Sequence, residues 1–239
     1  MSLAWILSLG FLLGLKHATE ADHLAAVATM VSERRNIWSS TLIGGLWGLG
    51  HTISLVAAGI FVLLLDFQIS ERTERTLEFG VGAMLFLLGL NVLRKIIRGG
   101  TLHFHTHAHD AHVHVHPHLH KAGEEDEPHT HYEFSFNPRA LLIGMVHGLA
   151  GSAALMLLVL KTIESKTVGL LYIIVFGVGS IGGMMLMSFI VGLPFQLTSF
   201  RLNRFNLILQ SIAGLVSIGL GLLIVYEKGI TEGLLLGLS

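Results

Sequence analysis

Five ionisable residues lie within eight positions in an otherwise apolar segment near the start of the chain, which reads GLKHATEADHLAAVATMV. They are Lys16, His17, Glu20, Asp22 and His23, and we assign Lys16 no role. Ionisable side chains are costly in hydrocarbon, so they normally face a bundle interior and serve a function. The chain has no cysteine, which excludes thiolate sites. Imidazole and carboxylate ligands suit Ni²⁺, Co²⁺, Zn²⁺, Cu²⁺ or Fe²⁺. The cluster therefore predicts a transition-metal site.

Helix geometry limits how this cluster can act. At 3.6 residues per turn, His17, Glu20 and His23 share one broad face, whereas Asp22 points away from it. Either the helix unwinds locally, or Asp22 is an outer partner that orients an imidazole ligand. Two further histidines lie in other apolar segments. The candidate metal-site residues are His17, Glu20, Asp22, His23, His51 and His147.

The segments that must position these residues are membrane helices. Of 239 residues, 52% are hydrophobic and 13% are charged, whereas soluble domains are about 25% charged. We expect an all-α integral membrane protein, because a helix satisfies its own backbone in lipid. The first segment is long enough to span only if it continues through the polar cluster, so this helix is expected to be broken there. The six predicted spans are Leu3–Val31, Trp38–Leu65, Thr76–Ile97, Ala140–Leu160, Val168–Leu193 and Phe205–Tyr226.

Sequence features recur at an offset of about 130 residues. WGLGHT (Trp47–Thr52) in the second predicted span corresponds to FGVGSI (Phe176–Ile181) in the fifth, and His17 corresponds to His147. Glycines of the third and sixth spans are spaced alike: Gly82 and Gly89, Gly214 and Gly221. Three spans per half would make the second half enter the membrane from the opposite side. The sequence thus predicts two inverted three-helix repeats, an architecture in which transporters place the substrate near the midplane.

A histidine-rich tract of low complexity separates the two halves, which gives the chain three parts: residues 1–98, 99–137 and 138–239. Its histidines alternate with other residues. Such tracts bind transition metals and need not fold. We expect this tract to capture metal close to the membrane site. Its histidines are His103, His105, His107, His109, His112, His114, His116, His118, His120, His129 and His131.

The distribution of Lys and Arg predicts the orientation in the membrane, because cytoplasmic loops are enriched in both. With the N-terminus outside, nine basic residues lie on the inner side: Arg34, Arg35, Arg94, Lys95, Arg98, Lys121, Arg139, Arg201 and Arg204. Five lie on the outer side: Arg72, Arg75, Lys161, Lys166 and Lys228. We therefore expect a multi-pass protein of the cell (inner) membrane with both termini outside and the histidine-rich loop in the cytoplasm.

These motifs resemble those of a known family. HATEADH (His17–His23) resembles the HX4DH signature of the nickel/cobalt transporter family, the high-affinity nickel permeases, and LGHT (Leu49–Thr52) resembles the motif of its next span. HGLAGSAAL (His147–Leu155) is similar to the six-span UreH-like urease accessory branch. The resemblance implies metal recognition by His17, Asp22, His23 and His51. It departs at Ser188, where the larger permeases have an acidic residue.

The expected function is secondary transport of Ni²⁺ or Co²⁺, with uptake as the direction and the metal as cargo rather than cofactor. No GxxxxGK[ST] phosphate loop is present, so neither ATP hydrolysis nor any other enzymatic activity is expected. An efflux protein on the same scaffold and a non-transporting metal sensor or storage protein remain alternatives. A membrane desaturase would need more histidines at the cytoplasmic face. The resemblance implies cytoplasmic nickel-handling partners of urease or hydrogenase maturation; no nucleic-acid partner is expected.

Overall fold

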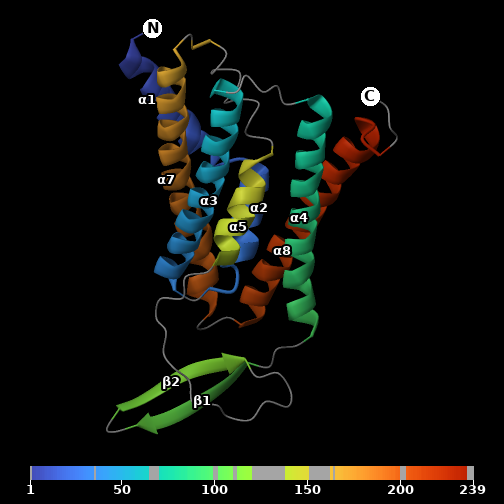
Figure 1. Cartoon of the computed structure of the whole chain (residues 1–239). Coiled ribbons are helices and arrows are strands. Elements are labelled where there is room, and N and C mark those ends of the chain that lie inside the picture. Colours follow the sequence, from blue (N-terminus) through green and yellow to red (C-terminus); the bar gives the residue numbers. More distant parts are fainter. Residues whose placement is uncertain are drawn as a thin grey trace.

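The structure is a computed structural model of the chain, and it describes residues 2–34, 36–64, 70–98, 102–109, 112–119, 138–150, 162–163, 165–199 and 203–235. Within these ranges, four helices are long and apolar enough to cross a membrane: α3 (Ile37–Leu64), α4 (Glu71–Ile97), α7 (Lys166–Ser199) and α8 (Asn203–Tyr226), which a π-helical turn, η1 (Glu227–Thr231), continues. The expectation of a helical membrane protein is confirmed (Figure 1).

The first predicted span is two helices. α1 (Leu3–His17) ends at the first histidine of the motif, and α2 (Ala21–Val31) begins after Glu20, whose extended backbone (φ −65°, ψ 150°) starts the new helix. The hydroxyl of Thr19 donates to the Lys16 carbonyl at 2.6 Å and stabilises the break. Neither helix alone has the roughly 20 residues that a bilayer crossing needs. The polar motif therefore interrupts the helix, as the sequence predicts.

The fourth predicted span, Ala140–Leu160, is seen in part. α5 (Pro138–Gly148) forms its first half, and the helix gives way to a turn after Gly148. Residues 151–161 lie outside the described ranges. The number of six spans therefore stays a prediction.

The helices pack in pairs, with α1 on α7, α5 on α3, α3 on α7 and α4 on α8 (Figure 1). Glycine makes two of these contacts possible. A Cβ at Gly14 would clash with the Phe176 carbonyl oxygen across α1 and α7, and one at Gly144 would clash with the Trp47 carbonyl oxygen across α5 and α3. Small residues at such points let helix backbones approach closely in membranes.

Two clusters of buried apolar side chains hold the bundle together. The larger includes Val27, Trp47, Leu85 and Met184, and the smaller consists of Leu55, Tyr172, Ile173 and Phe176. Large apolar side chains also lie on the outer surface, such as Trp5, which is 67% exposed. An exposed apolar surface suits a protein whose outer face contacts lipid tails.

The histidine-rich tract, which we expect to be a loop from its low complexity, contains a β-hairpin. β1 (Leu102–His109) pairs antiparallel with β2 (His112–Leu119), and the register puts histidine opposite histidine four times, from His103↔His118 to His109↔His112. The alternating spacing of the histidines explains the difference, because a period of two residues is that of a strand. His120, His129 and His131 lie outside the described residues.

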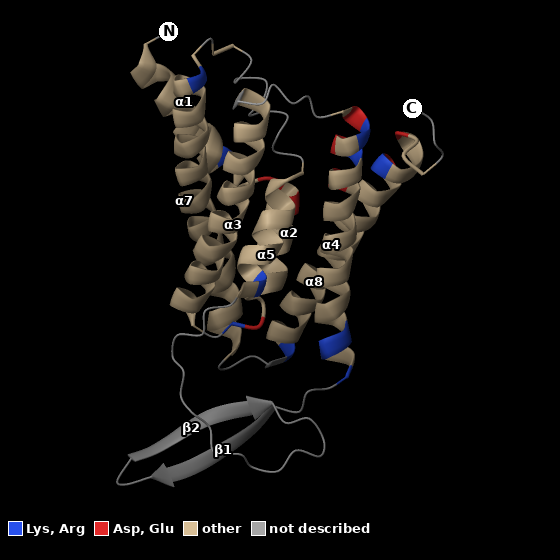
Figure 2. Ribbon diagram, viewed as in Figure 1, with Lys and Arg blue, Asp and Glu red and all other residues tan. Residues whose placement is uncertain are grey.

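The two ends of the bundle differ in which chain segments lie there and in their charged residues. Both termini lie at one end, and the hairpin lies beyond the other (Figure 1). Figure 2 shows basic residues at the hairpin end of α4, where its last turn carries Arg94 and Lys95, and both acidic and basic residues at the opposite end. Arg35, Lys121, Lys161 and Arg201, which the orientation prediction also used, lie outside the described residues.

Candidate metal centre

The break in the first span brings four histidines from four helices together. His17 is the last residue of α1, His23 lies in the first turn of α2, and His51 and His147 face them from α3 and α5. His51 sits at the middle of the 28-residue helix α3, so the cluster lies at mid-depth of the bundle. The four side chains are 3%, 1%, 0% and 2% exposed. The structure thus unites residues that are up to about 130 positions apart in the sequence.

The imidazole rings are close enough to share one ion. The ring centroid of His17 lies 4.3 Å from that of His23 and 5.1 Å from that of His51, and the centroids of His23 and His51 are 5.3 Å apart. Each of these three rings offers a nitrogen within 4.8 Å of the nitrogens of the other two. His147 contacts the same group through His23, with a centroid separation of 4.3 Å.

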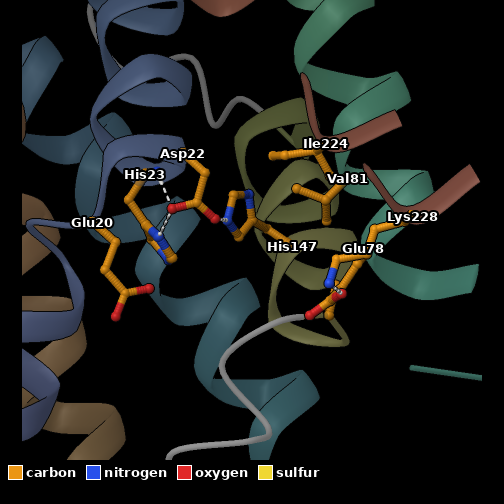
Figure 3. Close-up of a pocket in the computed structure, with 9 residues that line it drawn as sticks. Glu20, Asp22, His23, Glu78, Val81, His147, Ile224 and Lys228 are labelled. Atoms are coloured by element: carbon orange, nitrogen blue, oxygen red, sulfur yellow. Dashed lines mark hydrogen bonds and ion pairs between the residues drawn. The ribbon is translucent and has the colours of Figure 1, made fainter. Parts of the chain in front are cut away.

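Carboxylates fix the orientation of three rings. Glu20 Oε1 is 3.0 Å from His17 Nδ1. The two oxygens of Asp22 divide between two helices: Oδ1 is 3.1 Å from His23 Nδ1, and Oδ2 is 3.0 Å from His147 Nε2. Figure 3 shows the Asp22 carboxylate between these two rings. The sequence left two possibilities, a locally unwound helix or an Asp22 that orients an imidazole. The structure has both features, because the helix is broken and Asp22 contacts imidazole nitrogens.

The opposite nitrogen of each oriented ring is left without a partner. An ionised carboxylate only accepts hydrogen bonds, so the ring nitrogen facing it carries the proton and the other nitrogen keeps its lone pair. Those other nitrogens are His17 Nε2, His23 Nε2 and His147 Nδ1, and all three are buried with no hydrogen-bond partner among the described residues. Both nitrogens of His51 are also buried without a partner among the described residues, and one of the two has a lone pair in a neutral imidazole. Such lone pairs are what a transition-metal cation binds.

A second arrangement uses a carboxylate oxygen directly. Asp22, His23 and His147 also offer three ligand atoms that lie within 4.8 Å of one another. His23 belongs to both groups and therefore lies at the centre of the cluster. The arrangement can hold one cation with nitrogen ligands alone, or with nitrogen and oxygen together.

A cavity of about 160 Å³ adjoins the cluster on one side. Glu20, Asp22, His23 and His147 line it, whereas His17 and His51 do not. Its far wall carries Glu78 of α4 and Lys228 of η1 (Figure 3).

Sequence reasoning missed Glu78 and Lys228. Glu78 lies inside the third predicted span, so an acidic residue in an apolar segment was the available signal. Lys228 follows the sixth predicted span by two residues, and nothing in its local sequence connects it with Glu78.

Ser188 does not join the histidines. It is fully buried on α7 and packs against Gly44 of α3, where a Cβ would clash with its hydroxyl oxygen. The close approach leaves no room for a longer acidic side chain, which explains in packing terms why serine suits this position.

Comparison with known proteins identifies relatives along almost the whole chain. The chain is 38% identical over 234 residues to the urease accessory protein UreH of Bacillus sp. (strain TB-90), an alignment that covers 96% of this chain and 94% of that protein. It is 30% identical over 95 residues to the high-affinity nickel transport protein of Cupriavidus necator, covering 37% of this chain and 27% of that one.

A more distant relative is the chloroplast protein FOR GROWTH AND FERTILITY 2 of Arabidopsis thaliana, 27% identical over 92% of this chain and 55% of its own length. No family model matches the chain, and no solved structure matches it. Two of these relatives are an accessory protein and a transport protein by name.

Proposed function

The chain belongs to the family of the urease accessory protein UreH, and on that premise we propose that it is a secondary transporter that carries Ni²⁺ or Co²⁺ into the cell. The proposed substrate site is the histidine cluster at mid-depth of the bundle. Its proposed ligands are His17, His23 and His51, with Asp22, Glu20 and His147 as orienting groups or further ligands. The nickel transport protein of Cupriavidus necator, similar over part of the chain, supports the choice of substrate.

The observation that carries the proposal is the set of buried imidazole nitrogens that have no hydrogen-bond partner among the described residues. Each buried polar atom left without a hydrogen bond costs about 1–3 kcal/mol. A cation bound by His17 Nε2, His23 Nε2 and a nitrogen of His51 would remove three such costs at once. Carboxylates that hold the outer ring nitrogens are a common support of metal-bound histidine.

The ligand types favour late transition metals. Ca²⁺ and Mg²⁺ require mostly oxygen ligands, whereas this cluster offers at least four imidazoles within one contact network. Without thiolates, imidazole and carboxylate suit Ni²⁺ and Co²⁺.

The inverted repeat is part of the proposal, with residues 1–98 and 138–239 as the two halves. Matched contacts support it. The His17 ring lies 5.6 Å from that of Phe176, and the His147 ring lies 5.5 Å from that of Trp47, so each half places its histidine against an aromatic ring of the other half. The Gly14–Phe176 and Gly144–Trp47 contacts repeat this exchange. A two-fold relation of this kind would put the histidine cluster between the halves, where such transporters bind their substrate.

The proposed direction is inward, with the hairpin in the cytoplasm. A divalent cation entering a negative interior gains about 4.6 kcal/mol per 100 mV, since each charge gains about 2.3. The eleven histidines of residues 103–131 would bind metal that has crossed and hold it for cytoplasmic nickel-handling proteins of urease or hydrogenase maturation.

Uptake of Ni²⁺ by proteoliposomes tests the proposal. We expect His17→Ala and His51→Ala to abolish most uptake. Ser217→Ala is a matched control, because Ser217 is equally buried but bonds the Leu85 carbonyl at 2.8 Å between α8 and α4, away from the histidines. Uptake that survives both histidine substitutions at the rate of Ser217→Ala would refute the assignment.

A further inference from the structure

A second group of charged residues lies at the end of the bundle that carries the two termini (Figure 2), where α4 contacts η1. Lys228 Nζ of η1 donates to Glu78 Oε2 of α4 at 2.9 Å and to Glu232 Oε1 at 2.5 Å. Arg75 of α4 forms ion pairs in the same region, with its guanidinium 3.4 Å from Glu232 Oε2 and 3.0 Å from Glu71 Oε2. This network joins two elements that are about 150 residues apart in sequence.

The ion pair between Glu78 and Lys228 separates two cavities. Both residues line the cavity that reaches Asp22, His23 and His147. Both also line a second, more open cavity nearer the end of the bundle. Glu78 and Lys228 are each 20% exposed, so the pair is only partly accessible. A cation moving from the open cavity to the histidines would therefore pass this pair.

The charges of the open cavity favour a divalent cation. Its lining carries four carboxylates and two cationic side chains: Glu71, Glu74, Glu78 and Glu232, with Arg75 and Lys228. The excess is two negative charges, which would balance the two positive charges of one Ni²⁺. The inner cavity supplies an independent sign of a ligand, because His23 Nε2 and His147 Nδ1 are buried without a partner among the described residues.

The backbone that carries Lys228 is also unusual. η1 is a π-helical turn, with the Glu232 amide donating to the Glu227 carbonyl at 2.8 Å, five residues back. π-helical turns are rare and frequent at functional sites. Lysine is suited to a movable contact, because its ammonium is a compact charge on a flexible four-carbon stem.

From these observations we propose that Glu78 and Lys228 form an ion-pair gate, in which Lys228 occupies a carboxylate site that an entering divalent cation takes over before it reaches the histidines. The inference deepens the proposed function and rests on it. Glu78 and Glu232 are the transient ligands, and Lys228 keeps them neutralised while no metal is present. A carboxylate in a partly buried place needs such a partner, since an uncompensated charge there is strongly unfavourable.

Binding stoichiometry and uptake of Ni²⁺ together test the gate. In Lys228→Met the freed carboxylates of Glu78 and Glu232 should bind metal permanently, so equilibrium dialysis of the purified protein should find one more Ni²⁺ per chain than in the wild type. The additional ion should be lost in the double variant Lys228→Met/Glu78→Gln. A pair that only fastens η1 to α4 would change the thermal stability without adding a bound ion.

Glu78→Gln should raise the half-saturating Ni²⁺ concentration for uptake by about tenfold or more, the effect of one contact between charged groups. Its Ni²⁺ affinity at the histidines should change by less than about twofold, because sites that share no ligand behave independently. Lys228→Arg should slow uptake at unchanged stoichiometry, because the planar guanidinium fork holds carboxylates more rigidly. This conservative variant keeps the test decisive if Lys228→Met does not fold.

The matched controls are Glu33→Gln and Lys95→Met, which break an ion pair of 2.7 Å on the hairpin side of the bundle and should alter neither measurement. An unchanged stoichiometry in Lys228→Met, or an unchanged half-saturating concentration in Glu78→Gln, would overturn the gate. The proposed transport and the proposed gate can be refuted independently. A wild-type protein that binds Ni²⁺ but shows no uptake would refute transport. The number of Ni²⁺ ions bound by Lys228→Met would still decide whether Lys228 occupies a cation site.

Discussion

Asp22→Asn tests the role of the carboxylate that joins the two halves of the histidine cluster. Asp22 accepts from His23 Nδ1 at 3.1 Å and from His147 Nε2 at 3.0 Å. An amide of the same shape has one accepting oxygen and one donating nitrogen. It can therefore keep only one of the two contacts in its present sense. The ring that meets the amide nitrogen must accept there, which moves its own proton to the nitrogen that would face the metal.

The magnitude follows from that change. Loss of the partner that orients a metal-bound histidine weakens metal binding by about 10–100-fold. One of the two rings is affected directly and the other loses the ionic part of its contact, so we expect a weakening of about 100-fold, which equals about 2.8 kcal/mol. The fold should persist, because the side chain keeps its volume and the backbone amide of His23 can still donate to the side-chain oxygen, as it now does at 2.9 Å.

Competition dialysis with Ni²⁺ on the purified protein measures the affinity, and nitrogen NMR of labelled histidine reports the tautomers. Glu33→Gln is the matched control, a carboxylate-to-amide change in the ion pair with Lys95. An affinity of Asp22→Asn within about twofold of the control would contradict the reasoning, since an orienting carboxylate contributes at least about tenfold. A loss of thermal stability in Asp22→Asn as large as the one expected for Gly144→Ala would also contradict it, because the weaker binding could then come from a disturbed fold.

The remaining predictions concern packing, protons and the hairpin. Gly144→Ala should lower the stability in detergent by about 1–3 kcal/mol, the cost of overpacking, because its Cβ would meet the Trp47 carbonyl; thermal unfolding compares it with Gly182→Ala, which meets nothing within 4 Å and should be neutral. Ni²⁺ binding should weaken as the pH falls, because protons compete with the metal for each imidazole nitrogen; titration calorimetry at constant ionic strength measures this, and an affinity that stays the same down to the pH at which the protein unfolds would speak against imidazole ligands. Deletion of residues 103–131 should leave the initial rate of Ni²⁺ uptake unchanged and lower the amount of metal retained by the protein; loss of the initial rate would make the hairpin part of the transport path.

The membrane helices were largely predictable because apolar composition alone determines which segments can enter lipid. The residues at which the helices begin and end were less predictable. α4 begins at Glu71, five residues before the predicted Thr76, because Ser70 caps it and Arg75 pairs with Glu71 one turn away. Such local contacts extend a helix beyond the hydrocarbon, where hydropathy gives no signal. α7 likewise continues to Ser199, past the predicted Leu193 and through Pro194.

The residues of the candidate site were predictable where an ionisable side chain lies in an apolar segment. Histidines in apolar segments and the HATEADH spacing marked His17, His23, His51 and His147, and the structure places all four in contact. The pairing of Asp22 with His147 was not predictable, because it depends on how α5 packs against α2. The same holds for Glu78 and Lys228, whose contact crosses from α4 to η1. Sequence identifies groups that need partners, and only the packing decides which partners they meet.

The proposed transport depends on one cation that binds among the imidazoles at mid-depth of the bundle. X-ray absorption at the nickel edge measures its ligands, using purified protein that lacks the histidines of residues 103–131 and is loaded with one equivalent of Ni²⁺. We expect scattering from several imidazole nitrogens at roughly 2.0–2.1 Å, the usual metal–imidazole distance, and a loss of imidazole scattering in His51→Ala. A shell of oxygen alone, or a spectrum that His51→Ala leaves unchanged, would contradict it.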